Sequence, residues 1–229
     1  MAKAKESIRV SPSNLNLFRE CPRCFWLQMN ENIHRPSGIF PSLPGGMDGV
    51  IKIYFDEWRK RGELPPEIRE VVKGALFSDA ETMKKWRNWR TGLRYEDAEV
   101  GGVLSGALDD CVVDGGRYMP LDYKTRGYPP KEGGESFYQG QLDAYTLLLE
   151  ANGYPTAELA YLVYYFPRAV RENGVVEFEV EPKRVKTNTK NAKRELRDAI
   201  MCLRGPIPAR HSKCDYCSWG ESHGTPESE

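Results

Sequence analysis

Two short segments near the middle of the chain constrain its fold more than any other feature. Val103 to Val113 and Tyr118 to Arg126 are rich in strand-forming residues, and the Asp-Gly-Gly sequence between them is a strong hairpin signal. We expect the two segments to pair as antiparallel strands. Because side chains on a strand alternate between faces, Asp122 and Lys124 should project to one side, and the pairing should bring Asp109 toward them.

This hairpin would gather two carboxylates and one ammonium group at a single point. Asp109 and Asp122 supply hard oxygen ligands, which suit Mg²⁺ or Mn²⁺. Lys124 should keep its charge beside them, which favours electrostatic stabilisation over proton abstraction. Asp110 should face the opposite way along a regular strand. Since an isolated Asp-x-Lys triplet is more often a solvated strand face, the assignment depends on further motifs.

The order of those motifs resembles the PD-(D/E)XK nuclease superfamily, and within it the RecB-like and CRISPR-associated RecB-like exonucleases. The core of the resemblance is carried by Gly106 to Asp110 and by Leu121 to Thr125. Downstream, Gln141 and Tyr145 match the Gln-x-x-x-Tyr helix motif of RecB-type nucleases. Their spacing puts both on one edge of a helix, where they could face the metal site or a phosphate, so we include both as candidate catalytic residues.

The resemblance implies a metal-dependent deoxyribonuclease that acts on DNA ends or single strands and leaves 5′-phosphate products. It implies that the backbone carbonyl of Tyr123 joins Asp109 and Asp122 around Mg²⁺ or Mn²⁺, and that Lys124 contacts the attacking water or the scissile phosphate. A helicase, a CRISPR protein or a repair protein becomes a candidate partner. The alternative is a non-catalytic DNA-binding or scaffold module, which would have no chemical reason to hold all these residues together.

One departure from the superfamily pattern concerns the helix before the sheet. Many members carry a histidine metal ligand there, and the comparable stretch, Gly46 to Trp58, contains none. Asp48 could substitute as a ligand, because it lies at the start of an amphipathic helix that we predict from Asp48 to Arg61. It could equally be the N-terminal cap of that helix. The two interpretations have equal weight.

Two Cys-x-x-Cys pairs lie at opposite ends of the sequence: Cys21 with Cys24, and Cys214 with Cys217. In a reducing compartment such pairs are more often metal ligands than disulfides, and four thiolates suit zinc or an iron–sulfur cluster. The resemblance favours a [4Fe-4S] cluster, but related sites usually divide their cysteines one and three, so the even split keeps zinc as a rival. Either metal would join residues 11–35 to residues 205–219 and close a long loop.

The remaining pattern predicts one α/β (α+β) domain over residues 1–219, with a restriction-endonuclease-like mixed sheet flanked by helices. Pro22 should bend or restart the first helix, Pro36 to Gly46 should form a loop, and a helical segment should follow Pro65-Pro66. Residues 220–229 are typical of a disordered tail.

The composition limits how this chain could bind nucleic acid. Its 33 basic and 33 acidic residues give a net charge of zero, which excludes a broad basic surface. Binding would depend on local patches in which arginines pair with phosphates and tryptophans stack on unpaired bases. The candidates are Arg23, Arg126, Trp86, Arg87, Trp89 and Arg90. Without an apolar run long enough for a membrane helix, and without a signal-peptide stretch after Met1, we expect a cytoplasmic protein.

Overall fold

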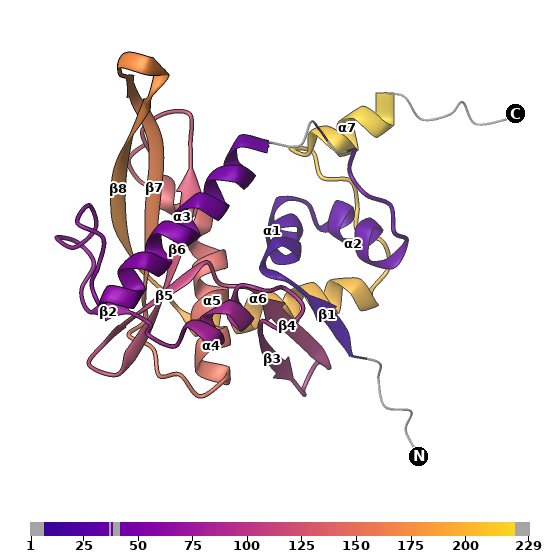
Figure 1. Cartoon of the computed structure of the whole chain (residues 1–229). Helices are drawn as coiled ribbons and strands as arrows, with labels where there is room; N and C mark the ends of the chain where they lie inside the picture. The colour runs from indigo at the N-terminus through magenta and orange to yellow at the C-terminus, as the bar shows by residue number, and fades with distance from the viewer. Residues whose placement is uncertain (1–6, 37, 39–41, 223–229) are drawn as a thin grey trace, which may run out of the picture.

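A computed structural model describes residues 7–36, 38 and 42–222, with side chains up to residue 218 (Figure 1). Its centre is a five-stranded sheet with the strand order β2-β5-β6-β7-β8. These strands are β2 (Ala75–Leu76), β5 (Asp110–Asp114), β6 (Arg117–Thr125), β7 (Leu159–Val170) and β8 (Val176–Lys186). Because β6 and β7 run parallel while the other neighbours are antiparallel, this sheet is mixed.

A second, three-stranded sheet has the order β1-β4-β3. It consists of β1 (Ile8–Val10), β4 (Gly102–Gly106) and β3 (Leu93–Asp97), with β1 parallel and β3 antiparallel to β4. The helices that flank the two sheets are α1 (Pro12–Glu20), α2 (Pro22–Asn30), α3 (Ser42–Arg61), α4 (Ala80–Trp86), α5 (Gln139–Ala151), α6 (Thr189–Arg204) and α7 (Asp215–Ser222), with short 3-10 turns η1 (Gly134–Tyr138) and η2 (Glu172–Gly174). The predicted α/β class, a mixed sheet flanked by helices, is confirmed.

The large sheet is covered on both faces, and the alternation of side chains along its strands explains how. On one face, Phe55 of α3 packs with Tyr123 of β6 and Val163 of β7. On the other face, Leu142 of α5 packs with Leu162 of β7. Period-2 alternation sends neighbouring residues of β7 into different cores, which is the pattern of a central strand.

Within the described ranges, no helix has the length and apolar character needed to cross a membrane.

The predicted strand from Val103 to Val113 is wrong in one respect, because it is two strands that belong to different sheets. β4 ends at Gly106 and only β5 pairs with β6, in the register Asp110 opposite Leu121. The chain crosses between the sheets at Gly106, where a Cβ atom would come within 2.9 Å of Leu148 Cδ1. Close packing against α5 therefore explains this glycine, and it places Asp109 at a bend rather than in a regular strand.

Of the two alternatives predicted for Pro22, the structure has the second, because Pro22 begins a new helix, α2, directly after α1. Two other local predictions in the N-terminal half need correction. The loop predicted from Pro36 to Gly46 overlaps α3, which already begins at Ser42, while residues 37 and 39–41 lie outside the described residues. The segment after Pro65-Pro66 forms turns rather than a helix.

The disordered tail predicted for residues 220–229 starts too early in the sequence. The backbone of α7 continues through residues 220–222, and residues 223–229 lie outside the described part of the chain.

Candidate active site

The Asp-x-Lys pair lies on β6 as strand alternation requires. The Lys124 ammonium group forms an ion pair with the Asp122 carboxylate, so the two side chains share a face. Leu121 and Tyr123 point to the opposite face, into the core beneath α3. Asp122 is 1% exposed, whereas Lys124 is partly exposed. The site thus combines a buried carboxylate with a cation that can reach a bound molecule.

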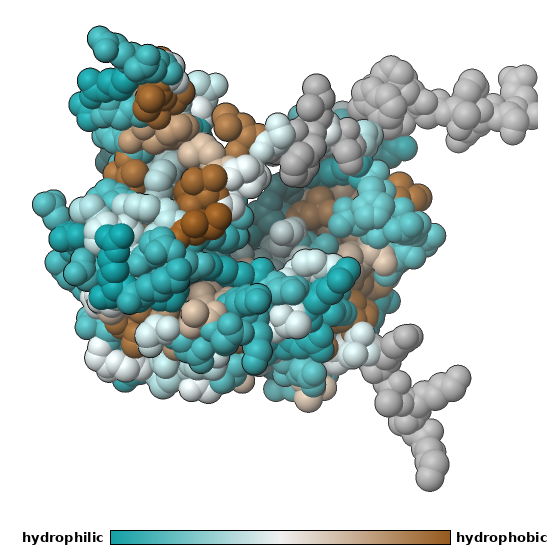
Figure 2. All heavy atoms as spheres, in the orientation of Figure 1, coloured by the Kyte–Doolittle hydropathy of each residue, from teal (hydrophilic) through white to brown (hydrophobic). Residues whose placement is uncertain are grey.

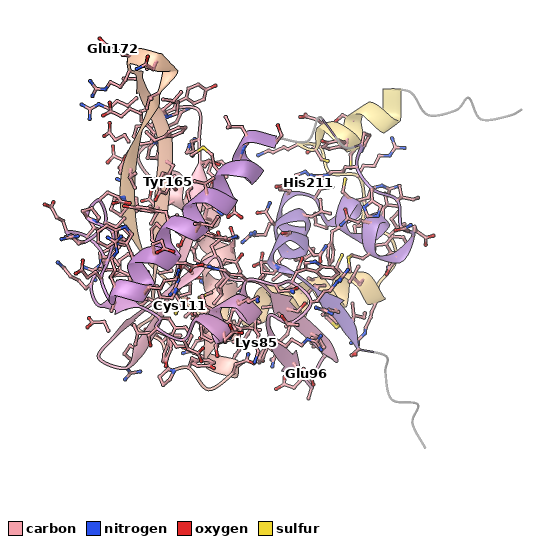
Figure 3. The ribbon with its side chains drawn as sticks, in the orientation of Figure 1. Lys85, Glu96, Cys111, Tyr165, Glu172 and His211 are labelled. Carbon is pink, nitrogen blue, oxygen red and sulfur yellow. The ribbon has the colours of Figure 1, made fainter. Side chains whose placement is uncertain are left out.

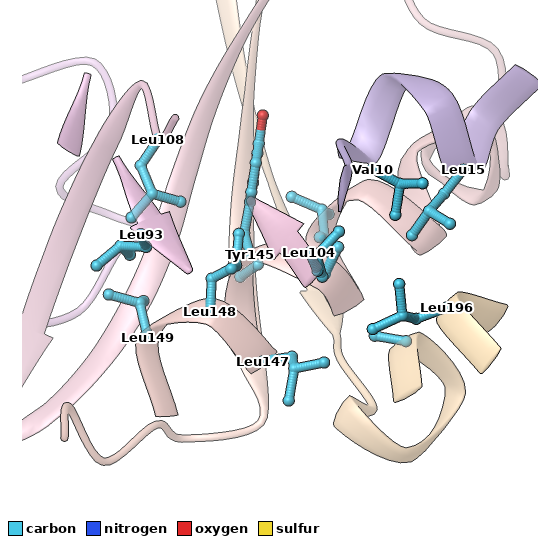
Figure 4. Packing of buried hydrophobic residues seen from close by; sticks show 14 of the residues in the cluster. Val10, Leu15, Leu93, Leu104, Leu108, Tyr145, Leu147, Leu148, Leu149 and Leu196 are labelled. Carbon is cyan, nitrogen blue, oxygen red and sulfur yellow. The ribbon is translucent and has the colours of Figure 1, made fainter. Parts of the chain in front are cut away.

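Helix α5 brings its polar edge onto the same face of β6. The Gln141 side chain accepts a hydrogen bond from Lys124 Nζ at 3.2 Å and donates to Asp122 Oδ1 at 3.3 Å and to the Tyr145 hydroxyl at 2.7 Å. The ring of Tyr145 is packed among leucines that include Leu148, and its oxygen points out of that cluster (Figure 4). The four-residue spacing on the helix therefore places both side chains at the Asp-x-Lys strand.

Asp109 approaches the same point from the bend before β5. One of its carboxylate oxygens accepts from the Tyr123 backbone N–H at 3.3 Å. The pKa of Asp122 is raised to about 7, mainly by burial and also by the nearby Asp109 carboxylate, while Lys124 opposes the shift. Because the Asp109 carboxylate disfavours the ionised form of Asp122, a cation placed between the two would stabilise that form.

Asp110, the next residue, has a different environment. It is fully buried and accepts hydrogen bonds from Arg59 at 2.7 Å, from Arg87 at 2.9 Å and from the Tyr123 hydroxyl at 2.7 Å. Arg87 also donates to the Asp109 backbone carbonyl at 2.8 Å. Adjacent aspartates thus face opposite ways, as predicted, and Asp110 belongs to a buried ionic network that holds the bend under the site.

The four paired cysteines converge although they come from opposite ends of the chain. Their Sγ atoms all lie within 4.8 Å of one another, with 3.6 Å between Cys21 and Cys217 and 3.7 Å between Cys24 and Cys214. They join the α1–α2 junction to the start of α7, where Figure 3 labels His211. The donor set is that of a four-thiolate metal site.

A model of the PD-(D/E)XK nuclease superfamily matches residues 50–222, well over half of the chain. The chain belongs to this superfamily. No curated protein matches it. The match covers β5, β6 and α5, which are the elements that bring the two carboxylates, the lysine and the glutamine together.

The residues of this PD-(D/E)XK site can be compared with the ligands that a divalent cation prefers. Asp109 and Asp122 are hard oxygen donors that converge, which suits Mg²⁺ or Mn²⁺. Such an ion, when bound, polarises the phosphate and lowers the pKa of its water. Among the described residues, the four cysteines are the only group of three or more His, Cys, Asp or Glu side chains with all ligand atoms within 4.8 Å. The carbonyl of Tyr123 as a further ligand stays a prediction.

Lys52 of α3 is a site residue that the sequence analysis missed. Its Nζ atom lies 3.0 Å from Asp109 Oδ1 and 2.7 Å from Asp48 Oδ2. Burial opposes the charged form, but the two carboxylates outweigh it and raise the Lys52 pKa. Asp48 cannot be an N-terminal cap, since α3 begins at Ser42, and its link to Asp109 passes through this lysine. The four-residue spacing from Asp48 to Lys52 was the available signal, but such pairs are usually solvated.

We expect the Lys52→Gln substitution to lower the Mg²⁺ concentration for half-maximal cleavage by about tenfold, because the ammonium group competes with the metal for Asp109. Titrations of cleavage with Mg²⁺ and of metal binding with Mn²⁺ measure the shift. Lys60→Gln is the matched control, since Lys60 is an exposed lysine of the same helix paired with Glu57. A higher metal requirement in Lys52→Gln would contradict this role.

The predicted nucleic-acid contacts divide into buried and exposed residues. Trp86 is 4% exposed and stacks on Phe77 with 4.8 Å between the ring centroids, so it is a core residue and not a base-stacking surface. Arg87 is committed to the buried network, with Asp56 as a further ion-pair partner at 2.8 Å. Arg23 donates to the Pro208 carbonyl at 2.9 Å and so connects the two ends of the chain.

The other predicted contacts are accessible. Trp89 is 67% exposed and its ring lies 5.0 Å from the Arg90 guanidinium carbon. Arg126 lies directly after β6 and is partly exposed. These three residues stay candidates for contact with nucleic acid.

Proposed function

We propose that the protein is a Mg²⁺- or Mn²⁺-dependent deoxyribonuclease of the RecB-like type, which acts on single strands or DNA ends and leaves 5′-phosphates. The observation that carries this proposal is the convergence of Asp109, Asp122, Lys124 and Gln141 from the bend before β5, from β6 and from α5. Membership of the superfamily supports phosphodiester hydrolysis. A helicase, a CRISPR protein or a repair protein would supply such ends and is the partner we propose.

Each side chain has a separate task in this proposal. Asp109 and Asp122 hold the cation, and Lys124 stabilises the negative charge that develops on the phosphate. Because Lys124 is ion-paired with Asp122, we assign it charge stabilisation rather than proton abstraction. Gln141 bonds both side chains and fixes their relative position, and the Tyr145 hydroxyl in turn accepts from Gln141.

The test is digestion of end-labelled single-stranded and duplex DNA by the purified protein with Mg²⁺, Mn²⁺, Ca²⁺ or a chelator. We expect cleavage with Mg²⁺ or Mn²⁺, no cleavage with the chelator, and products that a DNA ligase can join because they carry 5′-phosphates. Binding of DNA without any cleavage in all four conditions would contradict the enzyme and favour the non-catalytic DNA-binding alternative.

For the cysteine site we propose a single Zn²⁺ ion. Tetrahedral Zn–S bonds of about 2.3 Å separate neighbouring sulfurs by about 3.8 Å, which is close to the 3.6 Å between Cys21 and Cys217 and the 3.7 Å between Cys24 and Cys214. A [4Fe-4S] cluster binds each thiolate to a different iron atom, so it requires sulfurs that are farther apart. These separations therefore support zinc rather than the [4Fe-4S] cluster that the family resemblance favours.

We expect freshly purified protein to contain one equivalent of zinc and no iron, and to lack a broad absorption band near roughly 400 nm. Elemental analysis and the visible spectrum measure this. Removal of the metal with a strong chelator should lower the melting temperature by several degrees, because the unfolded chain regains the freedom that the closed loop had removed. One iron cluster per chain, with a brown colour, would contradict zinc and restore the [4Fe-4S] assignment.

A further inference from the structure

A groove of about 830 Å³ lies next to the proposed nuclease site, within the size range of pockets that hold small ligands or parts of larger ones. One wall comes from α1, and the other comes from the loop after β6 and from η1. Figure 2 shows the hollow between the side of the molecule that carries α1 and the side that carries α3 and the β7–β8 ribbon. The lining residues that matter here are Pro12, Arg19, Arg126, Tyr128, Phe137 and Gln141.

The groove leads directly to the catalytic lysine. Gln141 lines it and is hydrogen-bonded to Lys124 at 3.2 Å and to Asp122 at 3.3 Å. Tyr138, which also lines the groove, has its ring centroid 4.7 Å from Lys124 Nζ. A molecule that fills the groove would therefore touch the residues that surround the metal ligands.

Two aromatic side chains in this groove have their rings open to solvent. Phe137 is 83% exposed and Tyr128 is 76% exposed, which makes them the most exposed large hydrophobic residues in the part of the chain that the structure describes. Aromatic surface of this kind is costly to leave in water and is typical of a site that stacks on a flat partner.

The charge in the groove is positive and local. Among the described residues, no carboxylate lies within ion-pair distance of Arg126, whose guanidinium carbon lies 5.9 Å from the Tyr164 ring centroid. The acidic residue in the groove, Glu20, is ion-paired with Arg35 at 2.7 Å. Arg126 is therefore able to pair with a phosphate at the end of β6, two residues beyond Lys124.

We propose that this groove binds single-stranded DNA beside the scissile phosphate, with Phe137 and Tyr128 stacked on unpaired bases and Arg126 on a backbone phosphate. The inference rests on the proposed nuclease function and specifies its substrate. A duplex offers no free base faces to these rings, because its bases are stacked on one another. Stacking also supplies binding energy that the net charge of zero does not.

The test measures binding in a background that does not cut. Asp122→Asn protein is titrated against a fluorescent oligothymidylate, with Ca²⁺ as the metal. We expect Phe137→Ala and Tyr128→Ala each to raise the Kd about tenfold, within the range for loss of one base–aromatic stack. Val170→Ala is the control, since Val170 is a comparably exposed apolar residue at the end of β7 and outside the groove, and its Kd should equal that of the background protein.

Two further measurements separate stacking from charge. Replacing the bases of the oligonucleotide with abasic sites should weaken binding to the background protein and leave a variant that carries both Phe137→Ala and Tyr128→Ala unaffected. The slope of log K against log salt should be about −1.4 for two phosphate contacts by Arg126 and Lys124, and Arg126→Gln should reduce its magnitude by about 0.7.

Unchanged Kd values in Phe137→Ala and Tyr128→Ala, or a raised Kd in Val170→Ala alone, would overturn the groove assignment. Cleavage by the unmodified protein is scored separately. If it cuts DNA and the groove variants bind normally, the groove proposal fails and the nuclease proposal stands. If the groove variants lose binding but the unmodified protein never cuts, the groove proposal stands and the nuclease proposal fails.

Discussion

Asp122→Asn and Lys124→Ala are each expected to reduce DNA cleavage by at least about a hundred- to a thousandfold, the loss typical when a preorganised charge at a reacting centre is removed. Asparagine keeps the shape of Asp122 but removes the charge that would hold the cation. Alanine at position 124 removes the ammonium group that Gln141 positions on this face of β6. Both variants should keep the fold, because the cores above and below the sheet are unchanged.

Single-turnover cleavage at saturating Mg²⁺ measures this prediction, together with thermal unfolding and the metal content of the cysteine site. For Lys124→Ala we expect the loss in kcat rather than in KM, since its charge is proposed to matter most in the transition state. Lys60→Ala, an exposed lysine on α3, is the control and should cut at the parental rate. Parental rates in Asp122→Asn, in a preparation free of host nucleases, would refute the assignment of this site.

The second large expected effect is on the free energy of unfolding, and it differs between the adjacent residues Asp109 and Asp110. Asp110→Ala should destabilise the protein by about 3–5 kcal/mol, because it leaves two guanidinium groups without their shared carboxylate. Arg59 and Arg87 have side chains only 2% and 15% exposed, so water cannot replace that partner fully. Asp109→Ala should cost far less stability, since the Asp109 side chain is 23% exposed, but it should abolish cleavage.

Urea unfolding of the two variants, followed by circular dichroism, measures the difference in stability. The cleavage assay tests whether Asp109→Ala abolishes activity although it stays folded. Asp110→Asn is a useful intermediate, because it keeps the volume and part of the hydrogen bonding while it removes the charge. The ionic network would be refuted if Asp110→Ala unfolded at the parental urea concentration, or if Asp109→Ala were the less stable variant of the two.

Local rules predicted most of the site from sequence. Strand alternation placed Asp122 and Lys124 on one face and Leu121 on the other, and the structure has this arrangement. Helical spacing placed Gln141 and Tyr145 on one edge. The repeated Cys-x-x-Cys spacing predicted that the four cysteines would meet. The strand and helix predictions depend on the geometry of a single element, which a short stretch of sequence specifies, whereas the meeting of the cysteines was predicted from their shared metal-ligand chemistry.

Long-range packing decided the features that were missed. Lys52 reaches Asp109 because α3 crosses the sheet there. Trp86 is buried because α4 packs its ring on Phe77 rather than toward solvent. Arg59 lies 51 residues before Asp110 in the sequence, and nothing in either local pattern indicates that the two should pair.

The sequence by itself determined which chemical groups this protein has and which of them share a face of a strand or an edge of a helix, since backbone periodicity acts over a few residues. Tertiary structure alone decided that the chain would cross between two sheets at Gly106, so that Asp109 lies at a bend and β5 begins only at Asp110. The physical reason is that Leu148 of α5 and Pro12 of α1 both pack closely against this point, and such an approach between distant segments is set by the whole core.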